Sequence, residues 1–198
     1  MAAPASKTIN NLSGKWVMNK ELSDSPEPAL ALQGVGWMTR KAIGLATVTL
    51  HVVHTTGPPK PPNTSTDPVT LIDIEQTATA GLKGTAEHRC LDYEFREHSD
   101  WLFGHCRGQS AWRSPEEIDD AHLKKDWLEG PAEATGPDGK SHILSHVENL
   151  DSGWTATQIW GFQTVNGERR YVRNIVVAKD GERVEFKLIY DFIGEESS

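Results

Sequence analysis

The sequence has few cysteines and no long hydrophobic run. Its two cysteines, Cys90 and Cys106, are separated by 15 residues and form no Cys-x-x-Cys motif. Such a pair is typical of buried, reduced thiols rather than of a disulfide framework or a metal site. No segment approaches the roughly 20 apolar residues of a membrane helix, and residues 1–7 lack the apolar core of a secretory signal. We therefore expect a cytoplasmic protein without an integral membrane segment.

Positive charge is also scarce. Lysine and arginine total 20 against 28 aspartate and glutamate residues, which gives a formal net charge of -8. This balance argues against nucleic acid or an anionic membrane surface as a partner. The motifs of a serine nucleophile elbow, a phosphate loop and a dinucleotide site are missing, so the corresponding hydrolytic and hydride-transfer reactions lack support. We expect no cofactor, and the sequence leaves protein partners open.

The eight histidines do not have the spacing of a metal site. His51 and His54 lie three residues apart on a predicted strand, where their side chains point to opposite faces. His142 and His146 share a face but are roughly 13 Å apart at the rise of a strand. The other four are His88, His98, His105 and His122, which lie in separate predicted elements. We expect no metal site and read most histidines as surface or hydrogen-bonded residues.

Most of the chain has the period-two alternation of β-strands, as in residues 183–192. Asn166-Gly167 and Asp180-Gly181 are typical of two-residue hairpin turns and predict a meander of strands over 154–164, 169–179 and 183–192. Further strands are expected over 12–18, 47–55, 69–77, 84–93, 101–109 and 141–149, about nine in all. Because closure removes the exposed edges of such a sheet, we predict an all-β, closed up-and-down antiparallel β-barrel.

Two segments do not fit the strand pattern, and both are expected to be insertions in a single domain over residues 1–198. Residues 57–68 contain Pro58-Pro59-Lys60-Pro61-Pro62, which we read as a rigid loop in preference to an SH3-type ligand. In residues 114–139, Ser114-Pro115-Glu116-Glu117 has the cap, proline and carboxylates of a helix start. A short surface helix reaching about Leu128 is predicted there.

The most informative stretch follows the first predicted strand, which carries Gly14-Lys15-Trp16. A polar turn leads to one helical pattern after Ser23, Gly34-Val35-Gly36 interrupts it, and a second pattern covers residues 37–45. A helix-turn-helix between two barrel strands cannot belong to the sheet. We therefore expect residues 23–45 to cap an open end of the barrel as a lid.

These residues resemble the intracellular lipid-binding proteins, the fatty-acid-binding family of the calycin superfamily. That family has a Gly-x-Trp strand before a helical segment like residues 31–41, here Ala-Leu-Gln-Gly-Val-Gly-Trp-Met-Thr-Arg-Lys. The resemblance implies a ten-stranded barrel with a helical portal, carrying fatty acids without chemistry. The family's Arg-x-Tyr anion anchor is incomplete, since only Tyr190 of Leu188-Ile189-Tyr190 matches. Arg173 could replace the arginine if it faces inward; it could equally face solvent or stack on Trp16.

Seven tryptophans suggest either core filling or an aromatic cavity wall suited to a flat or polycyclic ligand. Charged residues on predicted strands could act as interior acids or bases, namely Asp73, Glu75, Glu87, His88, Asp92 and His105, although each is more often an outward-facing residue. The candidate ligand-binding residues are Trp37, Met38, Trp101, Phe103, His105, Gln158, Trp160, Arg173 and Tyr190. No catalytic residue is assigned.

Three functions are compatible with these features. The first is a binding or carrier protein for a fatty acid, sterol, terpenoid or polyketide held in the barrel cavity. The alternative is a calycin-like cyclase or isomerase, because a shaped cavity with one acid or base leaves almost no local motif. The third is a β-protein that binds a partner through its Pro-rich loop. A sealed interior packed with tryptophan would exclude the first two.

Overall fold

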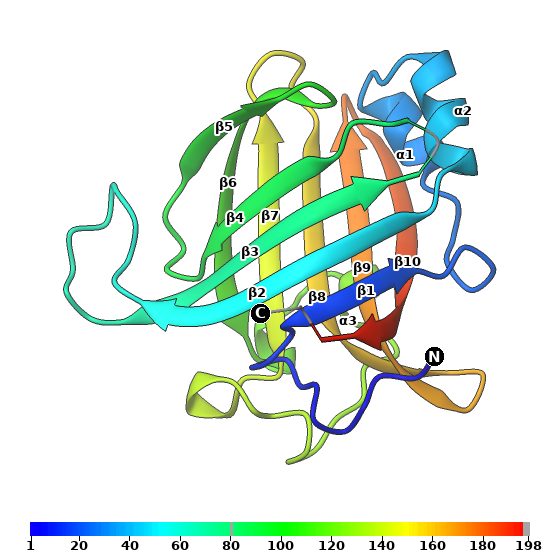
Figure 1. The fold of residues 1–198 in the computed structure, drawn as a ribbon. Helices are drawn as coiled ribbons and strands as arrows, with labels where there is room; N and C mark the ends of the chain where they lie inside the picture. Colours follow the sequence, from blue (N-terminus) through cyan, green and yellow to red (C-terminus); the bar gives the residue numbers. More distant parts are fainter. Residues whose placement is uncertain (80, 196–198) are drawn as a thin grey trace.

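The computed structural model describes residues 1–79 and 81–195. Ten antiparallel strands form one continuous sheet that curves into a barrel (Figure 1). The strands are β1 Gly14–Met18, β2 Val48–Gly57, β3 Val69–Ala78, β4 Thr85–Cys90, β5 Arg96–Asp100, β6 Gly104–Arg113, β7 His142–Asn149, β8 Thr155–Val165, β9 Glu168–Lys179 and β10 Glu182–Gly194.

The sheet has the order β4-β3-β2-β1-β10-β9-β8-β7-β6-β5. Every strand pairs with its neighbours in sequence except that β4 does not pair with β5, and the first strand pairs with the last. β4 and β5 are the two ends of this order, so the barrel is nearly closed, with one interruption in its ladder. The predicted all-β, up-and-down barrel is confirmed.

Strand β5 was missing from the nine predicted strands. Its sequence, Arg96-Glu97-His98-Ser99-Asp100, contains no apolar residue and so no alternation that period-two analysis could detect. The strand forms because it pairs with β6 along its whole length. The two predicted hairpin turns are confirmed, since Asn166, Gly167, Asp180 and Gly181 all have positive φ.

The helix-turn-helix caps one end of the barrel, as predicted. Helix α1 (Glu27–Leu32) buries Ala29 and Leu30 and contacts β9 and β10, while α2 (Trp37–Leu45) buries none of its residues. In Figure 1 these helices lie beside the turn between β9 and β10. We call this the lid end.

The opposite end, the closed end, is sealed by the segment before β1. Ile9 and Leu12 are fully buried there, and the buried ammonium of Lys7 donates to the carbonyl of Ser13 and pairs with the carboxylate of Glu195. Figure 1 shows this segment and the 114–139 insertion below the strands, away from α1 and α2.

The insertion does not form the single helix predicted to about Leu128. A short 3-10 helix, η1 (Pro115–Glu117), ends at Ile118, whose extended backbone turns its side chain into a buried apolar cluster. Helix α3 (Ala121–Lys124) then starts anew because the Asp120 carboxylate accepts from the backbone N–H groups of His122 and Leu123. A further 3-10 helix, η2 (Pro137–Gly139), precedes β7. The insertion covers the outer face of β8 and β9.

The Pro-rich loop is held at its base by one arginine. The Arg96 guanidinium donates to the carbonyl oxygens of Lys60 and Pro61 and forms an ion pair with Asp92 at 2.7 Å.

Among the helices that the structure describes, none is long and apolar enough to cross a membrane.

Candidate functional site

A cavity of about 460 Å³ lies inside the barrel at the lid end. This volume falls within the range of small-molecule sites. The wall comes from both lid helices and from all ten strands, so chain segments distant in sequence meet around it. The interior is therefore not sealed by tryptophan, and a binding function remains possible.

Most of the wall near the lid is apolar. Ala29 of α1 packs in one cluster with Trp154 and Phe186, and Phe103 packs against it. The rings of Phe103 and Trp154 meet edge to face, with centroids 5.6 Å apart. This arrangement offers aromatic and aliphatic surface to a ligand without a strong hydrogen-bond demand.

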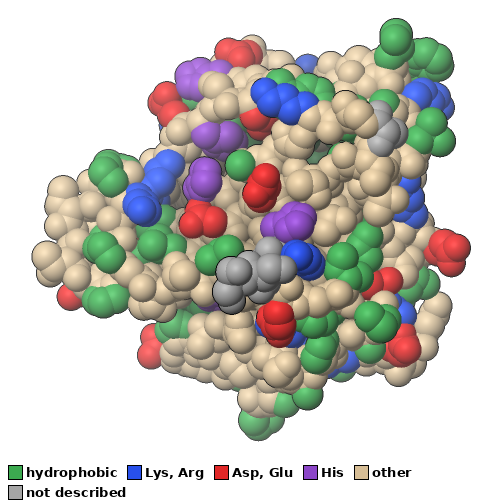
Figure 2. Space-filling model, in the orientation of Figure 1, with side chains coloured by type: hydrophobic (Ala, Val, Ile, Leu, Met, Phe, Trp, Pro, Cys, Tyr) green, Lys and Arg blue, Asp and Glu red, His purple; other side chains and the backbone are tan. Residues whose placement is uncertain are grey.

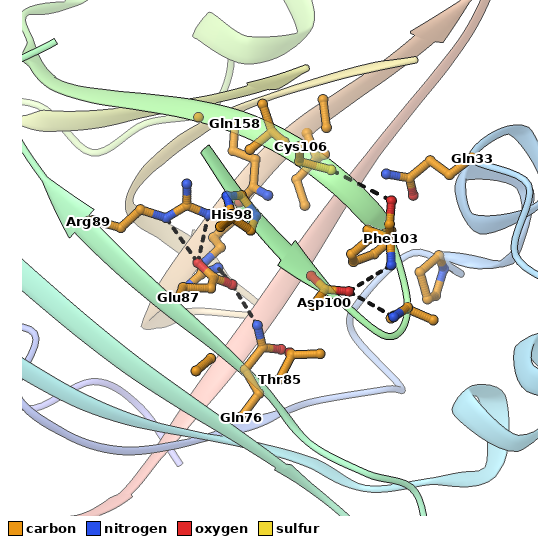
Figure 3. A pocket seen from close by; sticks show the side chains of 18 of the residues that line it. Gln33, Gln76, Thr85, Glu87, Arg89, His98, Asp100, Phe103, Cys106 and Gln158 are labelled. Carbon is orange, nitrogen blue, oxygen red and sulfur yellow. Dashed lines mark hydrogen bonds and ion pairs between the residues drawn. The ribbon is translucent and has the colours of Figure 1, made fainter. Parts of the chain in front are cut away.

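One side of the cavity carries a group of paired polar side chains (Figure 3). Glu87 on β4 accepts from Nε2 of Gln76 at 2.5 Å and from Nη2 of Arg89 at 3.0 Å. Burial favours a raised pKa for Glu87, but the charges of Arg89 and Arg173 outweigh it and hold the pKa below its ordinary value. Glu87 is therefore ionised at neutral pH.

Arg173 reaches into the barrel from β9. Its Nε donates to the Tyr171 hydroxyl at 2.9 Å, its Nη1 lies 3.6 Å from the Glu87 carboxylate, and its guanidinium stacks 4.0 Å from the Trp160 ring. Arg173 thus faces inward, and it stacks on Trp160 where stacking on Trp16 was one expected alternative. Burial opposes its charge, but Tyr171 and Tyr190 raise the pKa of Arg173 above the ordinary value.

His98 on β5 also lines the cavity, as Figure 3 shows. Burial, and next the charge of Arg89, lower the pKa of His98. The imidazole is neutral at pH 7 and can accept or donate a hydrogen bond. It is the one histidine among the described residues whose placement inside the wall and lowered pKa both suit an interior acid or base.

The structure brings five of the nine candidate ligand-binding residues to the cavity wall: Trp101, Phe103, Gln158, Arg173 and Tyr190. Trp37 and Met38 are 63% and 77% exposed, because they lie on the side of α2 that faces solvent. His105 points outward to Glu97, since β6 turns its neighbour Cys106 inward. Trp160 is fully buried below the cavity and donates to Gln158.

Sequence reasoning did not select Gln76, Arg89 or His98. Arg89 shares a strand face with Glu87, which was considered as an interior acid, and this spacing could have identified it. His98 could not be found because its strand was not predicted. Asp73 and His88 are joined by a hydrogen bond of 2.6 Å, and both side chains are more than half exposed.

No group of three or more potential metal ligands occurs among the described residues. In Figure 2, histidine and acidic side chains are spread over the outer face formed by β2 to β5. Cys90 and Cys106 are free and buried, and burial raises the pKa of both thiols. The cavity can therefore bind and orient a molecule through apolar contacts and a few charged hydrogen bonds.

The chain is similar in sequence to two pericyclases. It is 33% identical over 198 residues to the probable pericyclase scpY of Mollisia scopiformis, covering 98% of this chain and 95% of that protein. The chain belongs to the family of these pericyclases. Pericyclase pydY of an Acremonium species is 31% identical to the chain over 201 residues. That match covers 98% of this chain and 98% of pydY. No model of a known protein family matches the sequence.

Solved structures share the fold with this pericyclase-family chain. The fatty-acid-binding protein of Schistosoma mansoni with arachidonic acid has a TM-score of 0.56 at 12% identity, covering 91% of this chain and 95% of that one. Fatty-acid-binding protein 1 of Echinococcus granulosus has a TM-score of 0.53 at 14% identity, covering 92% and 97%. The fold implied by the resemblance is confirmed.

Proposed function

We propose that this protein binds a small hydrophobic molecule in the barrel cavity and catalyses a pericyclic reaction of that molecule. The observation that carries the proposal is the 33% sequence identity with the probable pericyclase scpY along 98% of the chain. Because the similarity extends over the whole barrel, it includes the lid, the cavity wall and the insertion.

The cavity geometry supports this chemistry. A pericyclic step makes and breaks bonds in one cyclic movement of electrons and transfers no group to the protein. An enzyme accelerates such a step mainly by holding the reacting carbons close together in the right orientation. An enclosed wall of aromatic and aliphatic side chains can impose that conformation on a flexible chain. This also accounts for a sequence without a hydrolytic or nucleotide-binding motif.

The lining points to a ligand with a long apolar part and a polar end. Phe103, Trp154 and Phe186 suit the apolar part, while Arg89, Gln158 and Arg173 can meet oxygen atoms. A polyketide, terpenoid, sterol or fatty acid of suitable size has this character. A polyketide or terpenoid polyene also has the conjugated double bonds that a cycloaddition or an electrocyclisation requires.

Carriage of such a molecule without chemistry is the second candidate. The lid and barrel shared with the fatty-acid-binding proteins favour it, because those proteins have the same overall architecture at TM-scores of 0.53 and 0.56. Both functions use the same cavity and differ in whether the bound molecule changes.

We also propose a cytoplasmic location and no nucleic-acid partner. The two buried, unpaired thiols support the location, because such thiols persist in a reducing compartment. The net charge of -8 supports the second part of the proposal.

A deletion strain distinguishes catalysis from carriage. Cells lacking the protein should accumulate an uncyclised compound, and adding purified protein to their extract should convert it to an isomer of identical mass. Mass spectrometry and proton NMR would follow the loss of double bonds. Binding without conversion would leave carriage as the function. Failure of the extract compound and of anilinonaphthalene sulfonate to bind would overturn both candidates.

A further inference from the structure

One arm of the Arg173 guanidinium has no partner among the described residues. Arg173 is 3% exposed and lines the cavity, yet its Nη2 atom is buried without an acceptor. Buried charged donors are nearly always satisfied in folded proteins. Because Arg173 borders the cavity, a ligand that packs against it and shifts the side chains around Nη2 can supply the acceptor that this buried donor lacks.

The rest of the guanidinium is fixed in place. Nε is bonded to the Tyr171 hydroxyl, Nη1 faces Glu87, and the Trp160 ring supports the plane from one side. Glu87 is itself held by Gln76 and Arg89. The free nitrogen is thus pre-oriented by three neighbours of the guanidinium on β4, β8 and β9, as an electrostatic catalytic group requires.

The acceptor that fits best is a single neutral oxygen. A carboxylate binds arginine most strongly through two parallel hydrogen bonds, but Nε already donates to Tyr171 and Nη1 faces the Glu87 carboxylate at 3.6 Å, so a ligand carboxylate would lie beside a second negative charge. The described lining of the cavity also carries four acidic and four basic side chains. A ligand anion would meet no overall positive field there.

We propose that Arg173 donates a hydrogen bond through Nη2 to the carbonyl oxygen of an unsaturated ketone, ester or amide substrate. This inference rests on the proposed function and names the class of its substrate. Arg173 is then a catalytic residue, because it touches the group whose electrons control the reaction.

The hydrogen bond would draw electron density from the double bond conjugated to that carbonyl. In a cycloaddition, this electron-poor double bond and a diene in the same molecule lose three π bonds and form two carbon-carbon σ bonds and one new π bond. The electron pairs move only within the substrate, so no proton or electron is exchanged with the protein and no group leaves. Arg173 keeps its proton and releases the product carbonyl unchanged.

The position of Arg173 also sets the direction of the substrate. The inward residues of β9 run from Tyr171 at the closed end through Arg173 to Ile175 and Val177 near the lid. The carbonyl therefore lies deep, and the hydrocarbon chain extends toward α1 against Phe103 and Trp154.

The naphthyl ketone prodan tests this donor without knowledge of the substrate. Its carbonyl stretching frequency falls when the oxygen accepts a hydrogen bond, and dimethylaminonaphthalene is a matched probe without the carbonyl. Both would be titrated against wild type, Arg173→Met and the charge-compensated double variant Glu87→Gln with Arg173→Met. Arg107→Met is the control, because it removes an equal charge from a residue of β6 that pairs with Glu148 outside the cavity and leaves Nη2 of Arg173 in place. Circular dichroism would verify that each variant is folded.

We expect wild type and Arg107→Met to lower the carbonyl frequency of bound prodan and both Arg173 variants to abolish the shift. Prodan affinity should fall about tenfold in the Arg173 variants, while dimethylaminonaphthalene affinity stays constant. An unshifted carbonyl in wild type, with both probes bound, overturns the inference and leaves the proposed binding function intact. The fatty acid tetradecanoate would be titrated as a carboxylate probe. If its affinity falls far more than the affinity of prodan in the Arg173 variants, the inference is overturned in favour of a carboxylate ligand. Binding of neither probe would remove the proposed function as well.

Discussion

The two ends of the barrel interior are built from the same strands but are filled very differently. At the closed end, Trp16, Tyr171 and Phe162 pack together with Ile9 and Leu12 from the N-terminal segment. The ring of Trp16 contacts the rings of Tyr171 and Phe192, with centroids 5.2 Å and 5.0 Å apart. Large rings from several strands meet there and leave little space.

At the lid end, several of the inward positions carry smaller side chains. Val147, Ala156 and Val177 contribute short side chains, and the cap above them is Ala29 and Leu30 of α1. The cavity lies where these residues face one another. The size of inward side chains along each strand, with no change in backbone architecture, decides which half of the barrel is packed and which is hollow.

Two tryptophans give the strongest test of this contrast. Trp16→Ala should lower the free energy of unfolding by about 3–5 kcal/mol, because it opens a hole in the packed cluster. Trp154→Ala should cost clearly less, since Trp154 already borders the cavity on one side. Urea unfolding monitored by circular dichroism measures both. Equal losses would mean that the two ends are packed alike.

The closed end should also make stability depend on pH. Burial lowers the pKa of His142 to about 4 from 6.5, so between these values the unfolded chain binds more protons than the native one. Stability should therefore fall as the pH drops from 6.5 to 4, by up to about 3 kcal/mol for this residue. Urea unfolding at pH 7 and pH 4.5 measures the change.

The variant His142→Gln should remove that part of the pH dependence. Burial also lowers the pKa of His54 to about 4. In this variant His54 should therefore still make stability fall as the pH drops. His88→Gln serves as the control, because the His88 side chain is on the solvent face. A wild-type slope in His142→Gln would show that His142 is not buried in its neutral form.

Filling the cavity should affect binding more than stability. Ala156→Phe places a ring in the hollow end, so affinity for anilinonaphthalene sulfonate should fall at least about tenfold, about 1.4 kcal/mol. The free energy of unfolding should change by no more than about 1–2 kcal/mol, because the ring enters existing space. Fluorescence titration and urea unfolding measure the two effects. Thr157→Phe, on the outer face of β8, is the matched control and should bind as wild type does.

The smallest effect is expected on the lid. Trp37→Ser should change stability by less than about 0.5 kcal/mol and leave the affinity for prodan unchanged, because Trp37 is 63% exposed. Fluorescence titration and thermal unfolding measure both. A loss of affinity greater than twofold would show that Trp37 contacts the bound ligand.

Much of the fold could be predicted because its signals are local. Alternation and the turns at Asn166-Gly167 and Asp180-Gly181 predicted the meander, and the Gly14-Lys15-Trp16 strand with its following helices predicted the lid. β5 was missed because all five of its residues are polar and only pairing with β6 makes it a strand. The prediction of one helix from Ser114 to about Leu128 was wrong because Ile118 is buried against the barrel. The local sequence of a helix start does not encode that contact.

The candidate site was less predictable, and β9 shows why. From Arg170 to Val177 every residue of β9 is buried, since the cavity and core lie on one face and the insertion covers much of the other. A strand buried on both faces has no alternation that distinguishes inside from outside. The inward position of Arg173 could be considered from sequence but not decided.

The sequence by itself determined the class of fold, the number of hairpin turns in the C-terminal meander and the lid, because alternation, positive-φ turn residues and helix breakers act over a few neighbouring residues. Only the tertiary structure decided where the barrel is hollow and which polar groups meet there. Glu87 on β4 and Arg173 on β9 approach to 3.6 Å across the interior. Their meeting depends on how ten strands curve and register, which no local pattern encodes.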